Sequence, residues 1–148
     1  MQPWNRPLAA VAHVRGGAAA PHLTGTVRFQ QGRHGVVVTA HIAGLPAGAC
    51  GIFALHIHEG GACTGDGFAD TGGHYNPAGA DHPCHAGDLP PLFATGGGRA
   101  ELRVLTDRFS VREIIGRTVV IHSGPDDFTT QPAGNAGSKI ACGVIQPA

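Results

Sequence analysis

One stretch of the chain alternates regularly between two kinds of side chain: Ile52-Phe53-Ala54-Leu55-His56-Ile57-His58. In a β-strand, successive side chains point to opposite faces. Phe53, Leu55 and Ile57 would therefore share one apolar face. His56 and His58 would share the other face. The pattern predicts a strand that contributes one face to a hydrophobic core and carries two imidazoles on its other face.

Seven further runs of β-branched or alternating apolar residues flank this stretch, and Gly, Pro, Asn and Asp residues separate them. Together with 52–58 they make about eight expected strands. The other seven lie at 8–14, 22–31, 35–45, 92–95, 99–105, 117–122 and 139–145. A single short helix is expected at 110–115.

Length and composition favour one all-β domain. The chain has 148 residues, of which 24 are Gly and 11 are Pro, and 5% are aromatic. Domains are most often about 100–150 residues long, so residues 1–148 are expected to form one domain. Short strands separated by frequent turns are typical of sandwiches and flattened barrels. We therefore expect an eight-stranded Greek-key barrel or sandwich.

Two long segments interrupt the strand pattern, at 59–89 and 123–138. Both are rich in Gly, Asp, Pro and Thr, and neither has a sustained period. Long loops of this kind in a small domain are usually functional. We expect these two loops to carry the function.

The charge of the chain bears on its partners. Lys and Arg together number ten, and so do Asp and Glu, so net charge gives no basis for binding nucleic acid or an anionic membrane. A small molecule is the expected partner. Residues 1–17 lack the basic region, apolar core and small-residue cleavage site of a leader. This favours the cytoplasm, or the periplasm or cell exterior if a leader has been removed.

Histidine is unusually frequent, since the chain has ten and six lie between His56 and His122. His56 and His58 share a strand face and can reach a common ion; the alternative is a half-buried polar strand end. His122 follows three apolar residues, where it is either a ligand or a core histidine. The loop 59–89 adds side chains suited to tetrahedral zinc, namely His74, His82, His85 and Asp88.

Five motifs follow one another in a fixed order. They are His-Ile-His-Glu at 56–59, Gly-Gly-His-Tyr-Asn-Pro at 72–77, His-Ala-Gly-Asp-Leu at 85–89, Gly-Arg-Thr-Val-Val-Ile-His at 116–122 and Gly-Asn-Ala-Gly-Ser-Lys-Ile-Ala-Cys-Gly-Val-Ile at 134–145. In this order the chain resembles the copper/zinc superoxide dismutases. The resemblance implies an eight-stranded Greek-key barrel with metals on its outside, covered by the two long loops.

The resemblance also implies two metal sites that share one histidine. Copper would be bound by His56, His58, His74 and His122, and zinc by His74, His82, His85 and Asp88. His74 would bridge the two metals as an imidazolate. Asp126 matches the family's aspartate that links the sites through His56 and His82. Imidazoles suit copper in both oxidation states, whereas zinc has no redox chemistry.

The implied activity is disproportionation of superoxide to dioxygen and hydrogen peroxide, with His74 delivering a proton where peroxide forms. Lys139 stands where the family usually has an arginine that guides the anion, so we expect it to act in catalysis too. An alternative is a domain of the same fold that stores or delivers copper without turnover. A purely structural zinc domain would leave His56, His58 and His122 unexplained. Both a monomer and a homodimer are compatible with the sequence.

Four cysteines permit three pairings if all are oxidised, and sequence alone does not choose among them. The resemblance implies a disulfide between Cys63 and Cys142. Cys50 and Cys84 lie outside the family pattern and are either two buried thiols or a second bridge. Cys84, next to His85, is also a possible adventitious metal ligand.

Overall fold

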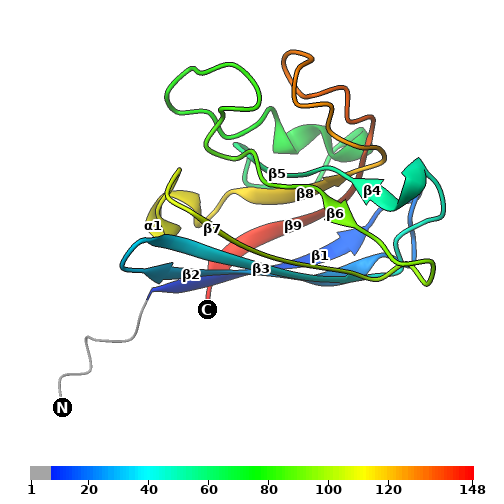
Figure 1. Cartoon of the computed structure of the whole chain (residues 1–148), viewed down its shortest axis with the longest axis horizontal. Helices are drawn as coiled ribbons and strands as arrows, with labels where there is room; N and C mark the ends of the chain where they lie inside the picture. The colour runs from blue at the N-terminus through cyan, green and yellow to red at the C-terminus, as the bar shows by residue number, and fades with distance from the viewer. Residues whose placement is uncertain (1–7) are drawn as a thin grey trace.

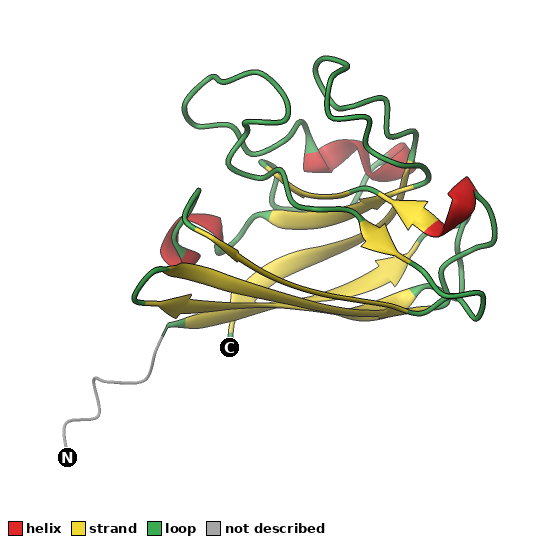
Figure 2. Ribbon diagram, in the orientation of Figure 1, coloured by secondary structure: helices red, strands yellow, loops and turns green. Residues whose placement is uncertain are grey.

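Short strands make up most of the regular structure in the computed structural model, which describes residues 8–148 (Figures 1 and 2). The strands are β1 (Ala9–Gly16), β2 (Thr24–Gly32), β3 (Gly35–Ala43), β4 (Ile52–Phe53), β5 (Leu55–His58), β6 (Leu92–Phe93), β7 (Ala100–Thr106), β8 (Thr118–His122) and β9 (Lys139–Pro147). The helices are α1 (Val111–Ile114) and two short 3-10 segments, η1 (Ala49–Gly51) and η2 (Asp66–Thr71). Every expected strand segment, and the expected helix, is present.

The strands form a curled antiparallel barrel. Seven of them make one sheet in the order β5-β8-β9-β1-β2-β3-β7, and β4 pairs separately with β6. The neighbours β3 and β7, and likewise β5 and β8, are not consecutive in the chain, which is the crossover of a Greek key. A tight turn, in which the Thr95 N–H donates to the Arg99 carbonyl at 2.8 Å, brings β6 beside β7. The all-β fold expected from the sequence is confirmed.

The barrel interior receives one face of each long strand. On β3 the buried residues are Val36, Val38, Ala40 and Ile42. On the stretch 52–58 they are Phe53, Leu55 and Ile57, which belong to the same hydrophobic core. Full burial of a Leu, Ile or Phe side chain stabilises a fold by roughly 1.5–3 kcal/mol. The apolar face predicted for this stretch is therefore confirmed, and it fixes which way the two histidines point.

The stretch 52–58 differs from the prediction in one respect, because it is divided into β4 and β5 at Ala54. The Ala54 N–H donates to the Gly124 carbonyl at 2.9 Å, and the Ala54 carbonyl accepts from the His122 N–H at 2.9 Å. Ala54 thus pairs with the end of β8 and the loop behind it. The division lets one stretch pair with β6 through β4 and with β8 through β5.

The two long connections lie on the same side of the barrel, at the top of Figure 1 above β5 and β8. One joins β5 to β6 and contains η2, and the other joins β8 to β9 across residues 123–138. Within residues 8–148, no helix has the length and apolar character needed to cross a membrane.

Candidate metal centre

Two neighbouring strands supply three of the histidines. His56 and His58 lie on the face of β5 that points away from the core and are 0% and 2% exposed. His122 ends β8, the strand that pairs with β5, and is 3% exposed. The register between β8 and β9 shifts at Ile121/His122, and such irregularities commonly re-aim a side chain next to an active site.

The first long loop returns along the free edge of β5. The Ile57 N–H donates to the Gly87 carbonyl at 2.8 Å, and the Ile57 carbonyl accepts from the Tyr75 N–H at 2.8 Å. Isolated bridges consequently pair His56 with Asp88 and His58 with His74. This backbone pairing brings loop residues directly opposite the strand histidines.

The predicted ligands converge in two groups that share His74. In each group one potential ligand atom per residue lies within 4.8 Å of all the others. The first group is His56, His58, His74 and His122, and the second is His74, His82, His85 and Asp88. The structure thus brings together all seven side chains that the sequence singled out as ligands.

Hydrogen bonds at the outer ring nitrogens set the tautomers of the histidines in the first group. The His58 Nδ1–H donates to the Gly72 carbonyl at 2.8 Å, and the His56 Nε2–H donates to Asp126 Oδ2 at 2.9 Å. The lone pairs of His58 Nε2 and His56 Nδ1 are left for another partner. His58 Nε2 lies 3.2 Å from His122 Nε2, and the buried His56 Nδ1 and His74 Nε2 have no hydrogen-bond partner. Converging lone pairs of this kind fit a cation.

The second group has the dimensions of a tetrahedral zinc site. Bonds of 2.0–2.1 Å from zinc to nitrogen or oxygen imply about 3.3–3.4 Å between neighbouring ligand atoms. His74 Nδ1 lies 3.1 Å from His85 Nδ1, and Asp88 Oδ2 lies 3.0 Å from His82 Nδ1 and 3.3 Å from His85 Nδ1. Three imidazoles and one carboxylate at these separations fit zinc.

Asp126 connects the two groups. Its carboxylate accepts from His56 Nε2 at 2.9 Å and from His82 Nε2 at 2.7 Å, so one oxygen holds each histidine. The backbone of Gly134 packs against this pair, has a φ of 72°, and would push a Cβ into the Asp126 carboxylate. Burial opposes ionisation of Asp126, but the hydrogen bonds from His56 and His82 outweigh it and keep its pKa below the usual range.

Burial also controls the strand histidines. The pKa of His58 is lowered to about 2 and that of His122 to about 3, mainly by burial, with smaller contributions from neighbouring imidazoles and Lys139. The pKa of His56 is lowered for the same main reason. These side chains are therefore neutral at physiological pH, the form in which imidazole binds metals.

An open pocket of about 480 Å³ leads to the first group. His58, His74, His122 and Lys139 all line it. Lys139, the first residue of β9, carries the charge expected to meet an anion there. Its ammonium donates to Thr71 Oγ1 at 2.8 Å and to the Gly72 carbonyl at 2.9 Å, so the side chain reaches across to the first long loop.

Two further residues hold the loop ligands and were not expected from the sequence. The Gln131 side chain accepts from the His82 N–H at 2.8 Å and donates to the His82 carbonyl at 2.7 Å. The Arg108 guanidinium donates to the carbonyls of Pro83 at 2.7 Å and His85 at 3.3 Å. Each is a lone polar residue far along the chain from the segment it holds, so no local pattern identifies it.

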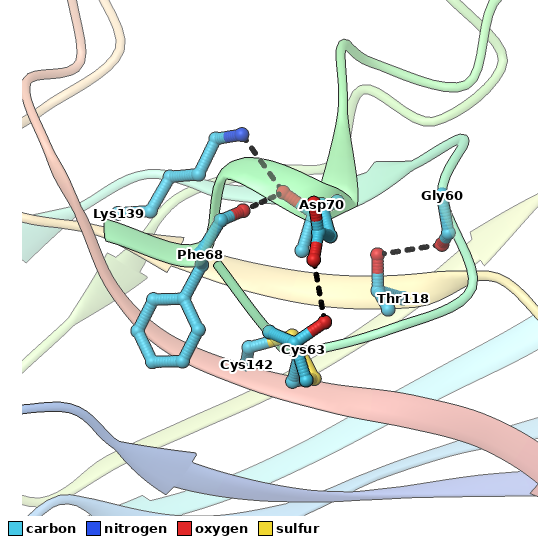
Figure 3. The surroundings of a disulfide bond; sticks show 9 residues. Gly60, Cys63, Phe68, Asp70, Thr118, Lys139 and Cys142 are labelled. Carbon is cyan, nitrogen blue, oxygen red and sulfur yellow. Dashed lines mark hydrogen bonds between the residues drawn. A yellow bond between two sulfur atoms is a disulfide. The ribbon is translucent and has the colours of Figure 1, made fainter. Parts of the chain in front are cut away.

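The implied disulfide between Cys63 and Cys142 is confirmed, with a Cα–Cα distance of 5.7 Å (Figure 3). It ties the first long loop to β9. Cys50 and Cys84 are free and exposed, so the expectation of two buried thiols or a second bridge is wrong. Cys50 lies in η1 and Cys84 lies in a turn where its N–H donates to the Asp81 carbonyl.

A β-barrel that carries two groups of potential ligands around one shared imidazole has the geometry of a protein that holds two metal ions close together. The family model described as "Copper/zinc superoxide dismutase (SODC)" matches residues 23–145. The chain belongs to the copper/zinc superoxide dismutase family. It is an enzyme that uses copper and zinc and disproportionates superoxide.

Curated relatives agree with this assignment. "Superoxide dismutase [Cu-Zn] 2" of Aquifex aeolicus is 40% identical over 126 residues, covering 76% of this chain and 72% of the relative. "Superoxide dismutase [Cu-Zn]" of Photobacterium leiognathi is 36% identical over 138 residues, covering 82% and 78%. The protein of that name from Deinococcus radiodurans is 36% identical over 145 residues, covering 84% and 78%.

Proposed function

We propose a division of labour between the two ligand groups of this superoxide dismutase. Copper is bound by His56, His58, His74 and His122, and zinc is bound by His74, His82, His85 and Asp88. The position of His74 carries the proposal. Its Nδ1 lies 2.8 Å from Asp88 Oδ1 in the zinc group, while its Nε2 is buried without a hydrogen-bond partner in the copper group. We propose one such pair of sites in a single domain per chain.

The reaction consumes two superoxide anions and two protons and yields one dioxygen and one hydrogen peroxide. Copper supplies the one-electron redox chemistry, and zinc supplies a fixed charge that organises the loop. His74 Nε2 is the atom that takes up and delivers a proton, since Nδ1 faces Asp88 and His85. Asp126 keeps His56 and His82 oriented throughout the reaction, as partners of metal-bound imidazoles generally do.

Lys139 attracts the substrate into the pocket. Its ammonium lies on the pocket wall with His58 and His122 and lowers the pKa of both, behind the larger effects of burial and neighbouring groups. A unit charge about 6 Å from superoxide contributes roughly 0.7 kcal/mol in water and about 2.8 kcal/mol at an effective dielectric of about 20. Salt screens part of this attraction. The contribution therefore concerns the rate of encounter more than the chemistry.

The disulfide bears on the compartment. Disulfides persist in oxidising compartments and are rare in the reducing cytoplasm. Of the expected locations, we infer that the periplasm or the cell exterior suits the Cys63–Cys142 bond better than the cytoplasm. Two predictions about partners stay untested. The protein is expected to be a monomer or a homodimer, which sedimentation checks. It is expected not to bind nucleic acid or membrane, which sedimentation in the presence of nucleic acid or lipid vesicles checks.

Metal analysis and spectroscopy test the ligand assignment. The purified, metal-loaded protein is expected to hold one copper and one zinc per chain and to dismutate superoxide. A His74→Ala variant should change the copper(II) electron paramagnetic resonance spectrum and lose zinc affinity. An unchanged spectrum and zinc content in this variant would show that His74 does not bridge. Full copper binding without turnover would instead favour copper storage or delivery.

A further inference from the structure

The ammonium of Lys139 is held at two points on the first long loop. Nζ donates to Thr71 Oγ1 at 2.8 Å and to the Gly72 carbonyl at 2.9 Å. An ammonium has three N–H donors, so one N–H remains. Because Lys139 lines the pocket together with His58 and His122, this remaining donor is the one available to an anion there.

The surroundings of Thr71 determine how its hydroxyl contacts Lys139. It is the last residue of η2 and is 0% exposed, although its side chain is polar. Its hydroxyl proton is used at the Phe68 carbonyl, 2.8 Å away. A hydroxyl has a single proton and two lone pairs. The oxygen of Thr71 can therefore only accept from Lys139, and its orientation is fixed by Phe68.

The second anchor connects Lys139 to the proposed copper group. The Gly72 carbonyl that accepts from Lys139 also accepts from the His58 Nδ1–H at 2.8 Å. One peptide oxygen thus sets both the tautomer of His58 and the reach of the ammonium. Thr71, the residue before Gly72, supplies a second acceptor. The ammonium therefore cannot rotate about its hydrogen bond to the Gly72 carbonyl.

We propose that Thr71 is a positioning residue for Lys139. This inference rests on the role of Lys139 in attracting superoxide that is proposed above. A lysine is a point charge on a flexible stem, whereas the fork of an arginine is planar and preorganised. The Thr71 hydroxyl and the Gly72 carbonyl together give Lys139 a fixed direction, with one N–H left for superoxide. Thr71 itself does not touch the substrate.

The expected effect is small but specific. A displacement of the ammonium by about 2 Å from a distance of about 6 Å weakens its attraction for an anion by about threefold in rate at an effective dielectric of about 20. Thr71→Val removes the acceptor and keeps the shape, so it should lower the dismutation rate about two- to fivefold. Thr71→Ser keeps the hydroxyl and should restore nearly the wild-type rate.

Lys139 is the only lysine in the chain, which provides a readout independent of activity. Lysine-specific ¹⁵N labelling of the reduced, diamagnetic copper- and zinc-loaded enzyme gives one side-chain ammonium resonance. Slow proton exchange and restricted motion are expected in wild type and Thr71→Ser, and their loss is expected in Thr71→Val. The matched control is Thr64→Val, because the Thr64 hydroxyl in the same loop donates to Asp70 at 2.6 Å and does not contact Lys139.

Pulse radiolysis on the same variants separates the inference from the function on which it rests. If Thr71→Val keeps the wild-type ammonium signal and rate, Thr71 does not position Lys139. If Lys139→Ala keeps the wild-type rate and salt dependence, the guiding role of Lys139 is wrong, whatever the ammonium signal shows. In a Lys139→Ala background, Thr71→Val should have no further effect on rate. Thr71→Ala replaces Thr71→Val if the latter does not bind both metals fully, and the same outcomes decide.

Discussion

The proposed ligands are held in place in two different ways. His56 and His58 belong to β5, which pairs with β8 on one edge and with the first long loop on the other. His82 and His85 lie in irregular loop, where side chains from elsewhere hold their backbone. Gln131 holds His82, and Arg108 holds the carbonyl of His85.

Because of this difference, we expect damage to the strand ligands and damage to the loop ligands to have different consequences. Strand ligands are fixed by a continuous ladder of backbone hydrogen bonds and by the core beneath them, so they keep their place as long as the barrel is folded. Loop ligands depend on a small number of separate contacts, such as the hydrogen bond between His82 and Asp126, and their loop is tied to β9 by the Cys63–Cys142 disulfide. Regions with few buried contacts open locally at lower free energy than the core. We therefore expect zinc binding to be the more easily lost.

The largest effects should come from removing one ligand of each kind. His122→Ala removes a strand ligand and should abolish dismutation by losing copper, while zinc and the fold are retained. His85→Ala removes a loop ligand and should lose zinc, retain copper and part of the activity, and speed amide exchange in residues 59–91. Metal content, pulse radiolysis and hydrogen exchange measure these outcomes. Equal loss of both metals in both variants would contradict the separation of the two groups.

Removing the disulfide should destabilise the protein, because the bond restricts the entropy of the unfolded chain. The bond joins residues separated by 79 positions, and a closed loop of that length stabilises by roughly 4–5 kcal/mol in the chain-entropy model. Cys142→Ser should lower the free energy of unfolding by about this amount in metal-free protein. Denaturant titration measures it. The control is Cys84→Ser, because Cys84 is free and exposed, and it should leave the stability unchanged.

The alternation of side chains carried most of the predictable information. The stretch 52–58 has a strict period of 2, and this alone placed Leu55 and Ile57 in the core and His56 and His58 outside it. The proposed ligands were predictable because their motifs resemble a known family. The division of the stretch at Ala54 was not, since it depends on hydrogen bonds to Gly124 and His122, residues distant in the chain.

The residues that hold the loops could not be predicted from the sequence either, because they also act on residues distant in the chain. Gln131, Arg108 and Thr71 are single polar residues without periodicity, and each acts on a segment that only the folded path of the loops brings near. The free state of Cys50 and Cys84 was also unpredictable, because pairing depends on where two turns lie in space. Contacts between irregular segments are a property of the whole fold.

Acid should destabilise the metal-free protein through the strand histidines. Burial lowers the pKa of His58 to about 2 and of His122 to about 3, whereas unfolded histidine titrates near 6.5. The unfolded state therefore binds more protons below about pH 6.5, and stability falls as the pH drops from there towards the folded pKa values. The loss between pH 7 and pH 5 is up to about 2 kcal/mol for each histidine. Denaturant titration at several pH values across this range measures the loss. His58→Asn should reduce the slope of the free energy of unfolding against pH. A stability that does not depend on pH would contradict the burial of neutral imidazoles.

The smallest expected effect comes from removing one contact that holds a loop ligand. Gln131 exchanges two hydrogen bonds with the backbone of His82, at 2.8 Å and 2.7 Å, and so joins the second long loop to the first. The side chain of Gln131 is exposed, so water replaces part of what Gln131→Ala removes, and a net loss of about 1 kcal/mol is expected. This corresponds to about a fivefold weaker affinity for zinc, measured by competition with a chelator, while copper affinity is unchanged because β5 and β8 are untouched.

Gln30→Ala, at an exposed position of β2 on the barrel wall, is the matched control and should alter the affinity for neither metal. If Gln131→Ala weakened copper binding as much as zinc binding, the strand and loop ligands would behave as one unit, and the distinction between the two ways of holding them would not apply to this protein.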